Sequence, residues 1–451
     1  MRYGRDVIQL LDLIQVQLYL LDAANRVGRG DGRGRPENRA QAAGSGSSRT
    51  GRQRPRRRRT PGSTGREQHR RRGAGKTAEA LRTRLTERYG IAYPIVQAGM
   101  AFYATPELAA AVTNAGGLGV LGPVPESPVG LRAQIQETRA LTKGPFGVDF
   151  VYFPFFDTTL GTPGYEQDPE HQSRNVTWSI NDGHVDVLIE EKVDFVVWYW
   201  TAPEPRWVEA LKAAGIPQWA QVGSVEGALE AVGYGAEVLV VQGKQAGGHV
   251  RGFQDGNPLH RSEIVALVKA AVREDVLVLG SGGIADGRTL VNALAEGADG
   301  GWVGTRFAVS EESYAHGEYM RRVIAVTDGW SETTPTAIFG PEFPSAYTRS
   351  IVNRVLAELK GKEDTIPTPP PGPAVVGTAR LMPWRACPAG SPTPWAKFSV
   401  IIPTRGSTGD FDEMCLLAGA ESSPIIKSVK PAGEIVADMA AEAAALLAGA
   451  G

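Results

Sequence analysis

Cysteine is scarce in this sequence: only Cys387 and Cys415 occur among 451 residues, and their spacing fits no metal or redox motif. Such scarcity is typical of a reducing compartment, so we expect a cytoplasmic protein. No run of 18 apolar residues occurs, which argues against any membrane-spanning helix. No His-x-x-x-His pair or cysteine cluster predicts a metal, and a GxSxG nucleophile motif is missing as well. The glycines of "GSGGIADG" lack the Lys-Ser/Thr that a Walker motif needs.

Acidic and basic residues balance overall but are separated along the chain. The formal net charge is −1, yet Met1 to Thr77 carry 18 Arg and 1 Lys against 6 acidic residues. That segment has a charge of +13, and the remaining residues therefore carry about −14. An acidic balance argues against a nucleic-acid-binding face on the folded part.

The first 77 residues consist mostly of Arg, Gly, Ser and Gln. This composition cannot offset the entropy lost on ordering, so we expect residues 1–77 to form a disordered, Arg-rich extension. An RNA-binding arm and an organelle-targeting peptide are the functional alternatives, although Asp6, Asp12 and Asp22 argue against targeting. We favour a dispensable extension, because "LRTRLTERYGIAYPIVQAGM" from Leu81 is typical of a natural start.

Short apolar runs alternate with amphipathic helical stretches after Thr77. Their hydrophobicity is continuous rather than alternating, which indicates parallel strands covered on both faces. Eight such units within about 230 residues match a closed (β/α)8 TIM barrel, and an open doubly wound sheet is the alternative. The expected strands are Pro94–Ala98, Leu118–Gly122, Phe146–Phe150, Asp194–Trp200, Pro217–Val222, Glu237–Gly243, Val276–Gly282 and Gly301–Thr305.

The alternation stops after Phe307, and irregular and proline-rich stretches follow. The chain then closes with an Ala-rich amphipathic helix. We therefore expect a barrel of residues 78–308, a smaller, mostly helical cap of residues 309–430, and a C-terminal helix of residues 431–451 that packs back on the barrel.

The stretch "KQAGGHV" (Lys244–Val250) follows the sixth expected strand. Chemistry in such barrels occurs where strands end and loops begin. Gly247 and Gly248 leave room for a flat ring or a substrate to approach the backbone, and His249 then projects into the barrel mouth. An imidazole is the natural proton acceptor or donor near neutral pH, so we predict that His249 is catalytic.

Glycine-rich loops follow the seventh and eighth expected strands. "GSGGIADG" (Gly280–Gly287) presents successive backbone N–H groups ahead of a helix, and Gly304 and Thr305 of "VGTRF" add further donors. Phosphate sites recur at these two loops of TIM barrels, so the pair predicts a bound phosphate group. The first strand ends in "VQAGMA" (Val96–Ala101), which is either a tight turn with a core methionine or a further ligand contact.

Together these motifs resemble a known family. "YPIVQAGMA", "NAGGLGVLG", "VVQGKQAGGHVRG", "GSGGIADGRTLVNALAEGADG" and "VGTRF" stand in the order seen in nitronate monooxygenases, formerly called 2-nitropropane dioxygenases. The similarity runs from about Leu81 to Phe307, and "VKPAGEIVADMAAEA" is similar to the family's C-terminal segment. The resemblance implies a barrel that binds FMN without covalent attachment, capped by a smaller helical domain.

The resemblance also assigns residues. His249 corresponds to the catalytic base, or to a group that orients an anionic substrate. The implied cofactor-binding residues are Ala98, Gly99, Met100, Asp149, Gln242, Lys244, Gly247, Gly248, Ser281, Gly282, Gly283, Gly304 and Thr305. Of these, the Ser281–Gly283 loop with Gly304 and Thr305 would hold the FMN phosphate. The implied reaction oxidises a nitronate with O2 to a carbonyl compound and nitrite, in a monomer or homodimer that binds neither membrane nor, through its folded part, nucleic acid.

Several departures from the family pattern leave alternatives open. Asp149 stands where the family usually carries Asn, and Gln245 stands where an acidic residue is frequent. The strand ends "DFVVWYW" and "DFVYFPFFD" are unusually aromatic. Val151 to Val176 also resembles an enlarged loop rich in Phe, Tyr and Pro, which is either a cover packed onto the barrel or part of a pocket for a bulky apolar substrate. An FMN-dependent enoyl-thioester reductase that consumes NAD(P)H is therefore the second hypothesis, and an RNA-associated protein that acts through its arginine tail is the third.

Overall fold

The computed structural model describes residues 73, 75–123, 126–152, 180–256, 258–340, 346–359, 361–362, 374–379 and 393–449. The expected extension of residues 1–77 lies almost entirely outside this part of the chain, as does most of the aromatic segment that follows Val151. Within the described ranges, no helix is both long and apolar enough to cross a bilayer.

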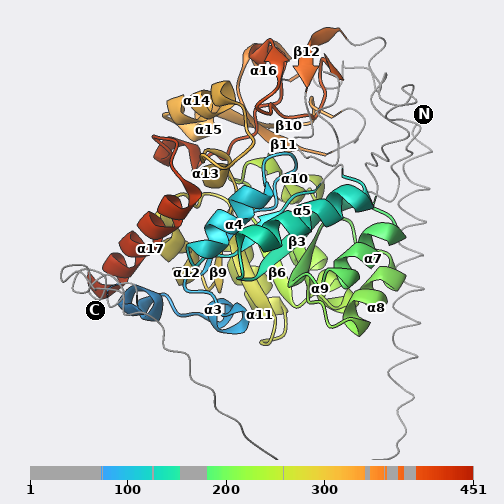
Figure 1. Cartoon of the computed structure of the whole chain (residues 1–451). Helices are drawn as coiled ribbons and strands as arrows, with labels where there is room; N and C mark the ends of the chain where they lie inside the picture. Colours follow the sequence, from blue (N-terminus) through green and yellow to red (C-terminus); the bar gives the residue numbers. More distant parts are fainter. Residues whose placement is uncertain are drawn as a thin grey trace, which may run out of the picture. The chain divides into compact units, whose positions relative to one another are not determined.

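Eight parallel strands form one sheet, and each coincides with an expected strand to within two residues at either end. The order is β1-β9-β8-β6-β5-β4-β3-β2. Val96 in β1 and Leu118 beside β2 form a parallel bridge that joins the two ends of this order. The sheet is therefore a closed barrel rather than an open doubly wound sheet (Figure 1). The strands are β1 (Ile95–Gln97), β2 (Gly119–Leu121), β3 (Phe146–Tyr152), β4 (Phe195–Trp200), β5 (Gln218–Val222), β6 (Val238–Gln242), β8 (Leu277–Ser281) and β9 (Gly300–Val303).

Helices cover the outer face of the barrel, and their starts follow from local sequence. The side chains of Thr105, Ser224 and Asp286 each accept a backbone N–H of the first turn, which satisfies donors that a helix leaves unpaired. The helices of this layer are α4 (Pro106–Asn114), α5 (Pro128–Leu141), α7 (Asp182–Glu190), α8 (Pro205–Ala213), α9 (Val225–Tyr234), α11 (Arg261–Ala271) and α12 (Gly287–Ala295). The short helix α13 (Thr305–Ala308) lies at the mouth of the barrel instead.

Aromatic side chains fill the end of the barrel interior where the strands begin. Phe195 and Trp219 stack with ring centroids 4.0 Å apart. The Trp219 indole donates to the hydroxyl of Tyr89 at 2.7 Å, at the end of α3 (Arg84–Tyr89), so the buried indole nitrogen is satisfied. This packing closes one end of the barrel, which leaves the opposite end, where the strands finish, for a binding site.

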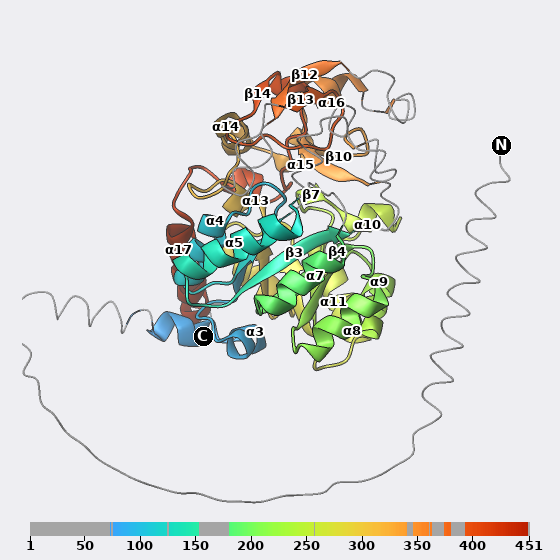
Figure 2. The same ribbon diagram turned by 45° about the vertical axis from the view of Figure 1, so that its right-hand side comes forward.

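The cap stands over the ends of the strands (Figures 1 and 2). It contains α14 (Gly317–Ala325), α15 (Gly329–Glu332) and α16 (Arg354–Leu359). Two three-stranded sheets, which the sequence pattern did not predict, complete it. These strands are two to five residues long and carry Thr, Pro and Gly, so they show no periodic pattern to detect. They are β10 (Thr333–Thr336), β11 (Thr348–Ile351), β7 (Gly248–His249), β12 (Val375–Ala379), β13 (Thr393–Ala396) and β14 (Thr408–Gly409).

The sheet β10-β11-β7 joins the cap to the barrel, because β7 belongs to the loop after β6. Thr348 pairs with His249 and Arg349 pairs with Gly248 in this antiparallel ladder. The Val250 N–H also donates to the Tyr347 carbonyl at 2.9 Å. The stretch that carries His249 is therefore a strand of the cap as well as a loop of the barrel.

The C-terminal helix α17 (Ala432–Gly449) lies against α12 and α4 (Figure 1). Its apolar face, with Ile435, Val436 and Met439, is buried in one cluster with Leu108 and Leu290 of those helices. Glu442 accepts the N–H of Gly287 at 2.9 Å, which satisfies a donor at the start of α12.

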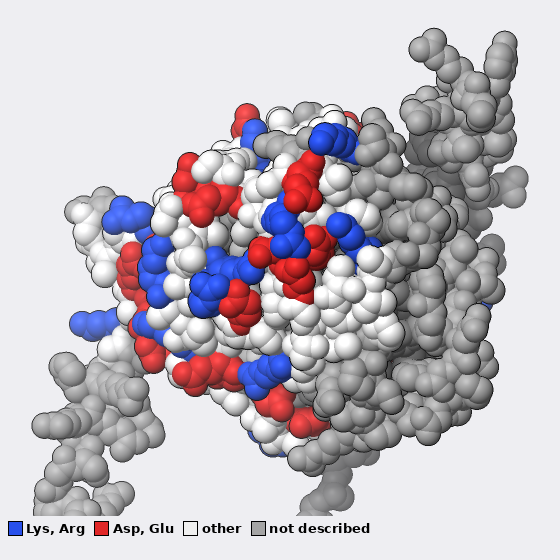
Figure 3. All heavy atoms as spheres, turned by 90° about the horizontal axis from the view of Figure 1, so that it is seen from above, with Lys and Arg blue, Asp and Glu red and all other residues white. Residues whose placement is uncertain are grey.

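Charges on the cap alternate in sign. Seen from above, lysines and arginines are interspersed with acidic residues over this face (Figure 3). Arg322 bridges Glu318 and Asp412, and Arg354 bridges Asp410 and Glu413. Among the residues drawn in colour, this face has no patch of a single sign.

Candidate functional site

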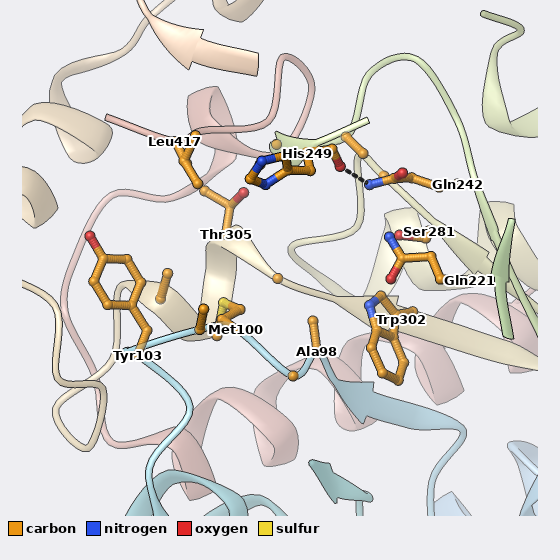
Figure 4. Close-up of a pocket in the computed structure, with 18 of the residues that line it drawn as sticks. Ala98, Met100, Tyr103, Gln221, Gln242, His249, Ser281, Trp302, Thr305 and Leu417 are labelled. Atoms are coloured by element: carbon orange, nitrogen blue, oxygen red, sulfur yellow. Dashed lines mark hydrogen bonds between the residues drawn. The ribbon is translucent and has the colours of Figure 1, made fainter. Parts of the chain in front are cut away.

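A cavity opens where the barrel strands end, between the strand ends and the cap. Figure 4 shows the His249 ring beside Thr305 and Leu417, with Gln242 on the backbone side of His249 and with Ser281 and Gln221 below Gln242. Ala98 and Trp302 lie along its base (Figure 4). Both halves of the fold therefore contribute to one site.

All but one of the residues predicted to bind or react lie around this cavity. Those that line it are Ala98, Gly99, Met100, Asp149, Gln242, Gly247, Gly248, His249, Ser281, Gly282, Gly283, Gly304 and Thr305. Lys244 is the exception. Its carbonyl oxygen faces the cap, where it accepts two hydrogen bonds from the guanidinium of Arg349, at 3.2 and 3.0 Å. The structure thus gives Lys244 a role in the loop backbone rather than in the cavity wall.

The loop after β8 forms a concave row of backbone donors. Gly282 has φ 104° and Gly283 has φ 74°, conformations that favour glycine. Among the described residues, the N–H groups of Gly282, Gly283 and Ile284 have no protein acceptor. Consecutive free N–H groups of this kind form a nest that binds anions. The loop can therefore hold a phosphate group through its backbone alone.

The loop after β9 and one cap segment extend this donor row. The hydroxyl of Thr305 accepts the N–H of Gly419 at 3.2 Å, which leaves its own hydrogen free for a ligand. Ser422 from the same cap segment also lines the cavity. Glu421, between them, hydrogen-bonds to His260 of the barrel at 2.9 Å. The cap segment Leu417–Ser422 therefore lies against the glycine-rich loops that follow β8 and β9.

His249 is held by its backbone and leaves its ring free. Its carbonyl accepts from Gln242 Nε2 at 2.7 Å and from the Tyr199 hydroxyl at 2.8 Å. Neither ring nitrogen has a hydrogen-bond partner in the described part of the chain, and the ring packs edge-on against Trp200. Burial lowers the pKa of His249 to about 4, so the imidazole is neutral near neutral pH and able to accept a proton.

Asp149 presents a carboxyl group to the same cavity. Its side chain is 4% exposed, and its Oδ1 atom has no hydrogen-bond partner among the described residues. Burial raises the pKa of Asp149 well above its usual value. An unsatisfied buried oxygen is costly, and a hydrogen bond from a ligand in the cavity would remove that cost.

The aromatic strand ends face two sides of the sheet, whereas residues 153–176, on which the alternatives of a cover and a pocket depend, lie outside the described residues. Phe150 and Trp198 point away from the cavity and pack with Trp207 of α8, so they belong to the outer core. Tyr199 and Val151 line the cavity instead. Alternate residues of a strand face opposite sides, which explains this division.

Several lining residues were not foreseen from the sequence. Gln221 and Trp302 come from strand ends, and a glutamine in the buried run "PQWAQV" was a usable signal because buried amides need partners. The others are apolar or small residues with no distinctive pattern. They are Ala101, Phe102, Tyr103, Ala246, Ile284, Ala308, Tyr319, Val400, Ile402, Leu417 and Ser422.

The donor set suits a ligand with a phosphate at one end and a flat polar ring at the other. The glycine loops supply free N–H groups, and Asp149, Gln221 and Gln242 supply polar side chains at the strand ends. No lysine or arginine lines the cavity within the described ranges, and no cluster of His, Cys, Asp or Glu there could hold a metal ion.

Comparisons with known proteins find a matching family. A family model described as "Nitronate monooxygenase" matches residues 82–442. The chain is 32% identical over 305 residues to a probable nitronate monooxygenase of Staphylococcus aureus (strain JH9), covering 64% of this chain and 83% of the relative.

A second relative carries a different name. The chain is 35% identical over 233 residues to the (3aS,4S,5R,7aS)-5-hydroxy-7a-methyl-1-oxo-octahydro-1H-indene-4-carboxyl-CoA dehydrogenase of Rhodococcus jostii (strain RHA1). That match covers 52% of this chain and 57% of the relative, so it spans little more than half of the relative's length.

Two solved structures share the fold. FabK from Thermotoga maritima is 27% identical with a TM-score of 0.60, over 82% of this chain and 98% of that chain. Nitroalkane oxidase from Streptomyces ansochromogenes is 26% identical with a TM-score of 0.61, over 81% and 99%.

Proposed function

The chain belongs to the nitronate monooxygenase family, and we propose that it oxidises alkyl nitronates with O2 in an FMN-dependent reaction that yields a carbonyl compound and nitrite. Membership makes it an enzyme of the flavin oxidoreductase type that acts on small molecules. In the proposed reaction, two nitronate anions and one O2 balance two carbonyl products and two nitrite ions. The observation that carries the proposal is a neutral, unpartnered imidazole in the same cavity as a row of free backbone N–H donors.

Different residues of the chain would bind the cofactor and remove the proton from the substrate. The Ser281–Gly283 loop, Gly304 and Thr305 would bind the FMN phosphate, and Ala98, Gly99 and Met100 would support the ring. Bound FMN supplies the electron transfer, which no side chain provides. His249 would remove the proton from the carbon of a neutral nitroalkane. Because burial lowers the pKa of His249 to about 4, a base fits the free site better than the alternative of a cationic clamp for the nitronate.

The cap side of the cavity supports an apolar substrate. Val400, Ile402 and Leu417 line it opposite the polar strand ends, together with Phe102 and Ala308. These side chains can bury the alkyl portion of a nitronate while the charged group lies at the polar end. An apolar nitronate therefore suits the cavity better than one with a second charge.

The test is direct. The purified protein should be yellow, heat should release its flavin, and the flavin should be identified as FMN by chromatography. With a preformed nitronate, the protein should consume O2 and release nitrite. A colourless protein that stays colourless after soaking in excess FMN would contradict the proposal.

The reductase hypothesis remains the second candidate, because the Rhodococcus jostii relative is named for a CoA thioester. Anaerobic mixing with NADPH separates the two. Rapid bleaching of the flavin would support a reductase, whereas unchanged flavin absorbance would support the oxidase.

The third hypothesis, RNA association through the arginine tail, has its own test. Removing residues 1–76 should leave flavin content and turnover unchanged. RNA that binds the full chain but not the shortened one would favour this hypothesis.

A further inference from the structure

The carboxyl group of Asp149 is fixed in its place by the neighbouring loop. Gly99 packs directly on it, because a Cβ at Gly99 would lie 2.2 Å from Asp149 Cβ and 2.7 Å from Oδ2. The side chain is 4% exposed and lines the cavity, with Oδ1 buried and unpartnered among the described residues. The protein therefore buries one carboxyl oxygen at the cavity wall without a hydrogen-bond partner among the described residues.

The charges around Asp149 do not favour an ionised carboxylate. On β4, which pairs with β3, the facing titratable side chain is Tyr199, and its hydroxyl donates to the His249 carbonyl. The neighbouring β2 carries no titratable residue, and neither does the loop at Gly99 and Met100. The other titratable groups on the cavity wall are Tyr103, His249 and Tyr319, and within the described ranges no lysine or arginine lies there.

Protonation follows from these surroundings. Burial raises the pKa of Asp149 well above its usual value, and no basic side chain opposes that effect. At neutral pH these surroundings favour the carboxylic acid form more than an exposed site would, and that form has one oxygen that donates and one that accepts. His249 is neutral under the same conditions, because burial lowers its pKa to about 4.

Building on the proposed function, we infer that Asp149 is a neutral hydrogen-bond donor to the ring of the bound flavin. The ring presents carbonyl oxygens and unprotonated nitrogens that accept hydrogen bonds, beside a single N–H group that donates one. A carboxylic acid can pair with both kinds of atom, whereas a carboxylate can only accept and would be repelled by the carbonyl oxygens. A buried carboxylic acid can act in this way, because an apolar site keeps its proton in place. Asp149 therefore assists binding only while it remains protonated.

The experiment measures FMN affinity against pH for the full chain and for Asp149→Asn, by fluorescence titration of the flavin-free protein. In the wild type, FMN binding should weaken by about tenfold or more as alkaline pH ionises Asp149, since one hydrogen bond is lost and a repulsive charge is gained. The flavin absorbance spectrum should shift over the same pH range. Asp149→Asn keeps a donor and cannot ionise, so its affinity and spectrum should stay level there.

Asp275→Asn is the matched control, because it makes the same chemical change on a side chain that is 73% exposed. It should keep the pH dependence of the wild type. An Asp149→Asn protein with the wild-type pH dependence would overturn the inference. A wild-type protein that binds no FMN at any pH would instead overturn the proposed function, so the two failures are distinguishable.

A second measurement needs no variant. The infrared difference spectrum between FMN-bound and flavin-free wild type, recorded near neutral pH, should show a protonated carboxyl band that shifts when FMN binds. A spectrum in which only ionised carboxylate bands respond would overturn the inference.

Discussion

His249 and Thr348 lie opposite each other in an antiparallel ladder, although one belongs to the barrel loop and the other to the cap. The next cap residue, Arg349, pairs with Gly248 and donates to the Lys244 carbonyl from its guanidinium. One cap strand therefore fixes the loop after β6 at both of its ends. The position of the imidazole depends on this contact.

Arg349→Met should destabilise the loop that carries His249. Arg349 is 2% exposed, so the substitution leaves the Lys244 carbonyl without two buried donors. We expect a loss of about 1–3 kcal/mol of unfolding free energy, measured by urea denaturation, and slower turnover with flavin retained. Arg321→Met is the control, because Arg321 is 67% exposed and forms only a surface ion pair with Glu318. Equal effects of the two substitutions would contradict a role for Arg349 in the loop.

His249→Ala should leave FMN bound and slow turnover of neutral nitroalkanes by about 10²-fold or more, because proton removal loses its base. Turnover of preformed nitronates, which need no proton removal, should decline far less. Stopped-flow measurement of flavin reduction separates the two. A His249→Ala protein that oxidised neutral nitroalkanes at the wild-type rate would contradict the proposed role of His249 as the base.

The lowered pKa of His249 determines how the reaction rate and the stability change with pH. Burial lowers the pKa of His249 from 6.5 to about 4, so the rate with neutral nitroalkanes should hold as acidity increases and fall only as the pH approaches about 4. Between pH 4 and 6.5, the His249 side chain is protonated to a greater extent in the unfolded chain than in the folded chain. The contribution of His249 to stability is therefore fully present above 6.5 and decreases as the pH falls toward 4. A rate that declines around the pKa of an exposed histidine would contradict this burial.

Gly282→Asp should abolish flavin binding, because it places a carboxylate against the proposed phosphate site. Repulsion of about 4 kcal/mol at close range corresponds to roughly a thousandfold weaker FMN. Gly297→Asp is the matched control, since Gly297 also has a positive φ, 97°, but faces open space away from the cavity. The ratio of flavin absorbance to protein absorbance measures the flavin content of both variants. A fully loaded Gly282→Asp protein would contradict the placement of the phosphate.

Substrate preference should follow the apolar wall of the cavity. For nitronates of increasing chain length, kcat/KM should rise by up to about fourfold per CH2 until the cavity is filled. A nitronate with a carboxylate group should be a poor substrate. Ile402→Lys adds a cation to the wall and should raise kcat/KM for the carboxylate-bearing nitronate relative to apolar nitronates. Leu229→Lys, on a residue of α9 that is 49% exposed, should leave this ratio of kcat/KM values unchanged. An unchanged preference in Ile402→Lys would place the substrate elsewhere.

The barrel could be predicted from the sequence because its signals are local. Each strand is a continuous apolar run, and the loops of Gly282 and Gly304 carry their glycines at the strand ends. The bridge between Val96 and Leu118 has no local signal, since closure depends on how strands far apart in the chain meet. Sequence order alone therefore favoured a barrel without excluding an open sheet.

The cap half of the site could not be predicted for the same physical reason. Val400, Ile402 and Leu417 are ordinary apolar residues that acquire a role only when the chain returns over the barrel mouth. The two-residue strand β7 is likewise too short for any periodic pattern. For Lys244 the sequence predicted a ligand contact. In the structure its backbone carbonyl accepts a hydrogen bond from Arg349, and Lys244 does not line the cavity.

Replacement of the cap of this chain is constrained by the ladder between Gly248–His249 and Thr348–Arg349. A chimera that receives a foreign cap acquires with it a new backbone partner for His249, the proposed base, so we expect chemistry and selectivity to change together. Keeping β11 and the segment Leu417–Ser422 native while replacing the remainder of the cap would allow selectivity to be redesigned with the reaction centre preserved.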